Sequence, residues 1–200
     1  MKRILSIFIF LLLCSQAYAM NVVMMSGEGT STAGASSETL GQETAGGTAN
    51  GAADNNMYCY KLGETPSSNG SIKSITVTAR SAGGTGNAHV RLSIYNHDAS
   101  NDIPSTVVTN SATAEIDVTS QTDYTFNYDT KPSVTSGTQY WLCYSGLYDA
   151  DSPQYLYTDG AGGRIAGKAI TYGQFPDWAG TAGGTTADRY FGKFNIVNEW

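Results

Sequence analysis

Apolar residues at every second position are the feature of this sequence that most constrains its fold. The pattern runs through residues 71–79 and 88–95, and it returns at 114–118 and 124–128. A two-residue period places alternate side chains on opposite faces of an extended strand, so that one face can be buried. These four segments are therefore predicted to be half-buried antiparallel strands.

A fifth segment, residues 138–145, is apolar on both faces. Tyr140, Leu142 and Tyr144 alternate with Trp141 and Cys143, which is typical of a central strand covered on both sides. Further strands are predicted at 57–62, 154–158 and 189–197. Turn-forming Gly, Asn, Asp and Ser residues separate these segments, and no twelve-residue window from residue 57 onward carries a helical apolar stripe. The pattern predicts an all-β fold, an antiparallel β-sandwich of jelly-roll type with about eight strands.

The first nineteen residues have the organisation of a signal peptide. Lys2 and Arg3 precede the apolar run 4–13, and Ala17 and Ala19 supply the small residues that signal peptidase reads. An apolar run of this length is too short for a permanent membrane span, which needs about 20 residues. We therefore predict export, cleavage before Met20, and a secreted or cell-surface location without a membrane span.

Residues 20–56 contain little that a core could use. Val22, Val23, Met24 and Met25 form a short apolar patch, and 22 of the 31 residues in 26–56 are Gly, Ser, Thr or Ala. Such a composition buries too little surface to offset its ordering entropy. The predicted organisation is a signal peptide at 1–19, an apolar segment and flexible tether at 20–56, and a β-sandwich domain at 57–200.

Charge and cysteine content limit the possible partners. Without Lys2 and Arg3, 9 of the 11 basic residues remain against 17 acidic ones, a net charge near −8. An acidic surface argues against nucleic-acid binding, because phosphates require positive charge. Cys59 and Cys143 are the two cysteines left after cleavage, and in an oxidising compartment they are expected to form a disulfide. The alternative is two buried thiols that act as small apolar side chains.

Several stretches of the sequence resemble those of a known group of modules. These stretches are Val90-Arg91-Leu92-Ser93-Ile94-Tyr95, Ser136-Gly137-Thr138-Gln139-Tyr140-Trp141-Leu142 and Gln174-Phe175-Pro176-Asp177-Trp178. They resemble the carbohydrate-binding-like β-sandwich modules of secreted bacterial surface proteins, polysaccharide-degrading enzymes and phage appendages. The resemblance covers roughly residues 57–200 and implies the sandwich fold, but it assigns no binding residue.

Five residues are candidates for binding a glycan. Tyr155 and Tyr157 share one face of a predicted strand, and Trp178 lies in a loop with Pro and Gly, so their flat rings are suited to stacking on a sugar. Asp159 and Arg164 are placed to bind its hydroxyl groups. Ordinary packing of the aromatic residues is the alternative interpretation.

A second candidate site is a calcium-binding loop. Asn96, Asp98, Asn101 and Asp102 concentrate side-chain oxygens in one short segment, and calcium takes six to eight oxygen ligands. Asn and Asp are also common turn formers, so the same residues fit an ordinary loop.

No motif in the sequence indicates an enzyme. His89 and His97 lie outside any recognisable catalytic pattern, and the chain lacks the Gly-x-Ser-x-Gly motif of many serine hydrolases. We expect a non-catalytic protein that recognises a polysaccharide, a surface glycan or another extracellular surface component. The alternative is a structural surface or filament subunit, in which residues 22–25 add as a strand to a neighbouring copy.

Overall fold

The computed structural model describes residues 37–41, 48–51, 55–83, 88–148, 151–178, 183–191 and 194–199. Side chains at 48–50, 148, 155–163 and 183–199 lie outside this description. Within the described residues the chain forms thirteen strands and no helix, and therefore no helix that could span a membrane. The strands are β1 (Ser37–Leu40), β2 (Thr48–Gly51), β3 (Asn56–Lys61), β4 (Gly70–Ser81), β5 (Ala88–Asp98), β6 (Ile103–Val107), β7 (Ile116–Val118), β8 (Thr122–Asn127), β9 (Ser133–Val134), β10 (Tyr140–Tyr148), β11 (Pro153–Ala169), β12 (Gly183–Phe191) and β13 (Phe194–Glu199).

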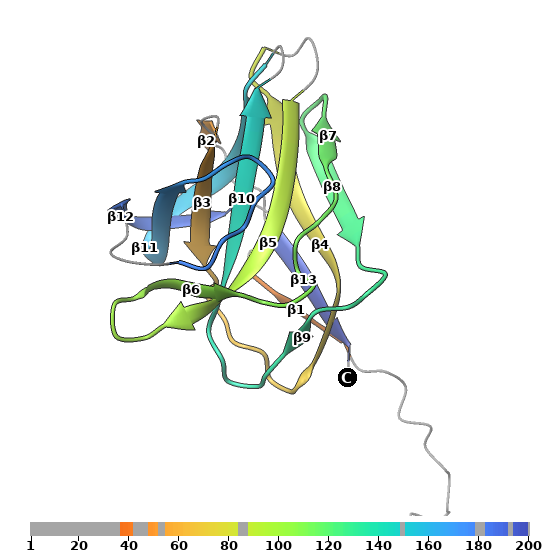
Figure 1. Ribbon diagram of the computed structural model, residues 1–200, viewed down its shortest axis with the longest axis vertical. Helices are drawn as coiled ribbons and strands as arrows, with labels where there is room; N and C mark the ends of the chain where they lie inside the picture. Colours follow the sequence, from red (N-terminus) through yellow and green to blue (C-terminus); the bar gives the residue numbers. More distant parts are fainter. Residues whose placement is uncertain are drawn as a thin grey trace, which may run out of the picture. The chain divides into compact units, whose positions relative to one another are not determined.

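The fold is an antiparallel β-sandwich, as predicted (Figure 1). The hydrogen-bonded path β1-β13-β4-β11-β3-β10-β5-β6 bends over into two layers. In one layer β4 lies between β13 and β8, and in the other β10 lies between β3 and β5. The 17-residue strand β11 connects them, because its first residues pair with β4 and its last residues with β3.

The longest predicted strands are confirmed, including the central position of residues 138–145, but the number of strands was underestimated. Strands β1, β2 and β9 have only two to four residues, which is too short for alternation to be recognised. The predicted strand 154–158 continues to Ala169, across a change of register between Asp159 and Arg164. Glycine tolerates such an irregularity, and residues 160–163 include three glycines. The predicted strand 189–197 is divided between β12 and β13.

The predicted domain boundary at residue 57 needs correction. Strand β1 pairs with β13 along its whole length, and Leu40 at its end is only 2 % exposed. Strand β2 pairs with β11. Both lie inside the segment predicted to be a flexible tether. Pairing with an existing sheet edge satisfies the backbone without apolar side chains, and one buried leucine adds about 1.5–3 kcal/mol of stabilisation. A segment with few apolar residues can therefore still form ordered strands.

The main core fills the space between the two layers. It contains Ile75 and Val77 from β4, together with Leu92 from β5 and Leu142 and Tyr144 from β10, all with no exposed surface. These are the inward positions that the two-residue period identified.

A second core covers the outer face of the β3-β10-β5 layer. It contains Met57, Trp141 and Ala166, and the disulfide between Cys59 and Cys143 lies within it. The disulfide confirms the predicted pairing, and the two cysteines face each other in the register of β3 and β10. A strand that is apolar on both faces is therefore explained by two cores on its two sides.

Residues 170–178, here termed the cover segment, close the second core. Figure 1 shows this segment as the blue loop that crosses in front of β3 and β10. Its turn requires Gly173, whose φ of 77° favours glycine and at which a Cβ atom would lie 3.2 Å from Arg91 Nη1. The backbone N–H of Trp178 donates to the Ser105 carbonyl at 2.6 Å, and Tyr95 Oη donates to the Pro176 carbonyl at 2.8 Å. The cover segment is thus bonded to β5 and β6.

Candidate functional site

A cavity of about 390 Å³ opens beside the first residues of β3. It is lined by Asn56 and Tyr58 from β3 and by Gly167, Lys168 and Ala169 from β11. In the register of the two strands Tyr58 faces Gly167, and Asn56 faces Ala169. Its volume is within the range of small-molecule sites, about 300–1,000 Å³. We refer to it as the Tyr58 cavity.

Small residues on β11 create this cavity. Tyr58 has Tyr144 as its neighbour on β10, with ring centroids 5.5 Å apart, whereas its neighbour on β11 is a glycine. The Tyr58 ring is therefore supported by Tyr144 on one side, and on the other side its partner in the register is a residue without a side chain. A glycine in a strand interior is a known mark of close approach by a ligand or another backbone.

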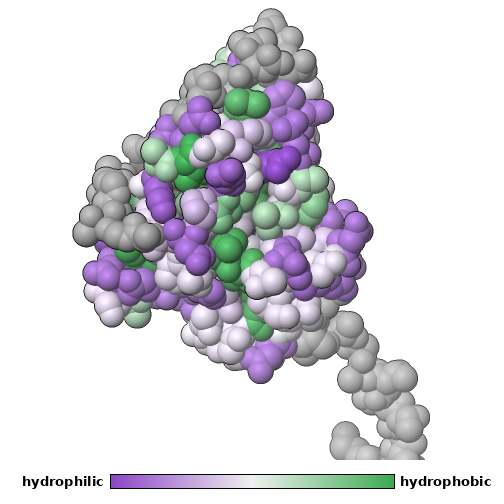
Figure 2. All heavy atoms as spheres, viewed as in Figure 1, coloured by the Kyte–Doolittle hydropathy of each residue, from purple (hydrophilic) through white to green (hydrophobic). Residues whose placement is uncertain are grey.

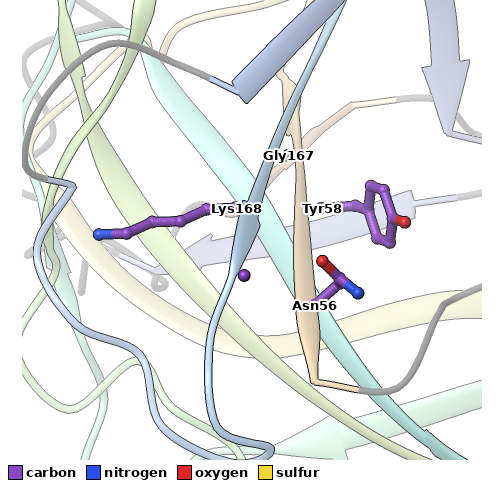
Figure 3. A pocket seen from close by; sticks show the side chains of 5 residues that line it. Asn56, Tyr58, Gly167 and Lys168 are labelled. Atoms are coloured by element: carbon purple, nitrogen blue, oxygen red, sulfur yellow. The ribbon is translucent and has the colours of Figure 1, made fainter.

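Of the five residues that line the cavity, only Lys168 is charged, and its side chain is turned away. Figure 3 shows that Asn56 and Tyr58 extend to one side of the strand pair and Lys168 to the other. The Lys168 ammonium donates to the Asp177 carbonyl at 3.1 Å and lies 5.8 Å from the centre of the Trp178 ring. The cavity thus offers an aromatic ring and an amide, and none of the five lining residues carries a carboxylate.

The predicted stacking platform is not assembled as expected. Trp178 is only 8 % exposed and packs in the second core, so it does not present a free ring face. Its position directly after an exposed Pro-Asp pair did not reveal that it packs against residues distant in the sequence. Tyr155, Tyr157 and Asp159 lie on β11, but their side chains fall outside the described residues.

Arg164, the fifth residue of that platform, belongs to an ion-pair network instead. Arg164 Nη1 lies 3.2 Å from Asp102 Oδ2, and Lys61 Nζ donates to Asp102 Oδ1 at 2.7 Å. Burial would raise the pKa of Asp102, but the hydrogen bond and charge of Lys61, with the charge of Arg164, lower it. His97 Nε2 lies 3.8 Å from the same carboxylate. The network therefore holds Asp102 in its ionised form.

The four predicted calcium ligands do not point to a common centre. Asn96 Nδ2 donates to Thr106 Oγ1 at 2.9 Å, and Asp102 faces Lys61 and Arg164. The Asp98 carboxylate accepts from Asn101 Nδ2 at 2.8 Å and from the Ser100 backbone N–H at 2.9 Å, and these bonds lower its pKa. This arrangement gives the calcium prediction no support and fits the turn-forming alternative.

The predicted self-association residues Val22, Val23, Met24 and Met25 lie outside the described residues. On the face shown in Figure 2, the described surface is mostly hydrophilic, and apolar residues appear there in small spots. Such spots are ordinary for a folded protein surface.

Comparison with known proteins identifies no family. No family model and no curated protein sequence matches the chain. Among solved structures, the chain is similar to one described as the structure of infectious bursal disease virus Gx strain, with 13 % sequence identity and a TM-score of 0.31. The match covers 82 % of this chain and 38 % of the viral chain.

Proposed function

We propose that this chain is an exported, non-catalytic β-sandwich module that recognises a glycan, and that one sugar residue of the glycan binds in the Tyr58 cavity. The observation that carries the proposal is the register of β3 and β11, which places an aromatic ring beside a glycine and an amide beside an alanine. The C–H face of a sugar stacks on an aromatic ring, and an amide donates to and accepts from its hydroxyl groups.

The charges around the cavity favour a neutral sugar. Lys168 is the one ionisable group other than the tyrosine among the five lining residues, and its ammonium is bound on the opposite side of the strands. Among the five lining residues, a phosphate or uronic acid would find no cation on the cavity side to neutralise it. The mostly hydrophilic face in Figure 2 is also appropriate for a protein that works in water on polar polymers.

Two observations support the other parts of the proposal. Hydrolysis of a glycosidic bond uses a pair of carboxylates in most enzyme families, and the described lining of the cavity offers none. The Cys59–Cys143 disulfide is typical of proteins that leave the cytosol. Together with the signal-peptide pattern at 1–19, these features are in keeping with a secreted binding module.

The test is affinity electrophoresis of the purified mature protein in gels that contain neutral polysaccharides. Retardation by at least one polysaccharide is expected. Tyr58→Phe should keep this retardation, because the ring remains, and Tyr58→Leu should weaken binding by about 10-fold or more, because stacking is lost. Gly167→Val should abolish binding by filling the space beside the ring, and valine is favourable within a strand.

The matched control is Thr122→Val, which places the same side chain at an exposed position of β8 in the other layer. Circular dichroism should show that all four variants are folded. A wild-type protein that no neutral polysaccharide retards, or a folded Gly167→Val variant that binds like the wild type, would overturn the proposal.

A further inference from the structure

His89, Glu115 and Asp117 come together at the edge of the β5 layer, although 26 residues separate the first two in sequence. Alternation along the strands explains this grouping. His89 is an outward residue of β5, and Glu115 and Asp117 flank Ile116, so their side chains share one face. The pairing of β5 with β7 then sets Asp117 directly opposite His89.

Both carboxylates lie close to one ring nitrogen of His89, Nδ1. His89 Nδ1 lies 2.8 Å from Asp117 Oδ1 and 3.5 Å from Glu115 Oε1, and the potential ligand atoms all lie within 4.8 Å of one another. Ligand atoms bonded at about 2.1 Å to one metal ion are roughly 3.0–3.4 Å apart in octahedral or tetrahedral geometry. The observed spacing is therefore close to that of a first coordination shell.

A residue from the cover segment orients one of the carboxylates. Tyr172 Oη donates to Glu115 Oε2 at 3.0 Å, which leaves Oε1 on the side of His89. Arg91 lies over the Tyr172 ring, with its guanidinium carbon 5.9 Å from the ring centre. Hydrogen bonds of this kind fix ligating carboxylates and are a regular part of metal sites.

Charge gives a second reason to expect a cation. His89 Nδ1 lies within hydrogen-bond distance of Asp117 Oδ1, while Glu115 Oε1 remains 3.5 Å away. Two carboxylates therefore lie beside one imidazole, a group that can carry at most one positive charge. A divalent ion placed among them could be bonded to all three groups.

We propose that His89, Glu115 and Asp117 form a binding site for a divalent transition-metal ion, with zinc the first candidate. One imidazole and two carboxylates match zinc, whereas calcium takes oxygen ligands alone. The side chain of His89 is 19 % exposed and that of Asp117 is 69 % exposed. Water therefore has access to the remaining coordination positions. The proposal is independent of the Tyr58 cavity.

The test is isothermal titration of zinc chloride into the tag-free mature protein. One equivalent of zinc should bind per chain. His89→Gln, Glu115→Gln and Asp117→Asn should each reduce the affinity by about 10-fold or more. Asp117→Asn is informative because the amide oxygen can still accept a hydrogen bond from His89. Zinc should also raise the melting temperature of the wild type but not that of His89→Gln.

The matched control is His97→Gln, which removes the other histidine of the chain outside the cluster and should leave zinc binding unchanged. An excess of calcium should not displace the zinc. Absence of zinc binding by the wild type, or zinc binding that survives all three cluster substitutions, would show that the three residues form only an ion-paired surface cluster. Displacement by calcium would overturn the assignment to a transition metal.

Discussion

At the scale of single residues, Trp141 determines which ring nitrogen of His97 accepts a hydrogen bond. The indole Nε1–H donates to His97 Nδ1 at 3.0 Å, so this nitrogen must carry a lone pair rather than a proton. The rings are also stacked, with centroids 6.1 Å apart. Burial and the charge of Lys61 lower the pKa of His97, and these effects exceed the opposite influence of Asp102. The fold therefore stabilises a neutral His97.

The first prediction concerns the pH dependence that follows. A histidine with a lowered pKa in the folded state contributes stability above its unfolded pKa of about 6.5, and this stability is lost as the pH falls below that value. We expect the mature protein to unfold at lower urea concentration at pH ~5 than at pH ~7.5. The carboxylates of Asp98 and Asp102 have lowered pKa values and titrate below this window.

The variant His97→Gln isolates the effect, because a glutamine oxygen can still accept from Trp141. Its difference in urea midpoint between the two pH values should be smaller than that of the wild type. An equal difference in both proteins would assign the pH dependence to other groups.

At the scale of elements, the cover segment acts as a third layer over one half of the sandwich. Trp178, Phe175 and Ile170 pack against the second core. Asp177 Oδ1 accepts from the Val107 backbone N–H at 3.0 Å, and the Ile170 backbone N–H donates to the Asn55 carbonyl at 2.8 Å. These bonds connect the segment to β6 and to the start of β3. A segment that resembles an exposed loop in the sequence therefore supplies one buried and two partly buried side chains to the core.

The second prediction tests this role of Trp178. We expect Trp178→Ala to lower the free energy of unfolding by about 3–5 kcal/mol, because a large buried ring is removed, and Trp178→Phe to lower it by less. Urea unfolding followed by circular dichroism measures both. Glycan binding by the folded Trp178→Phe variant should be unchanged. If Trp178→Phe lost glycan binding while its stability was unchanged, Trp178 would instead contact the glycan directly.

At the scale of the whole molecule, the sandwich begins earlier than the composition indicates and is closed by long-range contacts. Strand β1 lies at one end of the strand path, paired with β13 near the other end of the chain. The disulfide joins positions 84 residues apart, and on a chain-entropy model it contributes about 4–5 kcal/mol by restricting the unfolded state. Among the described strands β1 is also an edge, where another strand could add.

The third prediction uses two truncations that differ by five residues. A protein of residues 37–200 should melt close to the mature protein of residues 20–200, because β1 and Leu40 are kept. A protein of residues 42–200 should be less stable by about 2 kcal/mol or more, because the buried leucine is lost. Thermal and urea unfolding provide the comparison, and equal stability of the two truncated proteins would show that β1 does not stabilise the domain.

Size-exclusion chromatography of the same proteins tests the structural alternative. If residues 22–25 add as a strand to a neighbouring copy, the mature protein forms higher-order species and the protein of residues 37–200 is monomeric. Monomers in both cases would exclude assembly through this segment.

Local patterns in the sequence determined the fold class and the position of the central strand, and the number of cysteines with their expected compartment indicated the pairing of Cys59 with Cys143, which the structure confirms. These follow from side-chain alternation and from the chemistry of a cysteine pair, and neither requires knowing which strands lie side by side. Tertiary structure alone decided that Tyr58 faces Gly167, that Asp117 faces His89 and that Trp178 is buried. Each of these depends on the register between strands, or on a contact between segments far apart in the chain. The two-residue period indicates which face a side chain occupies, but many registers satisfy the same period. Only the packing of the complete sandwich selects one of them.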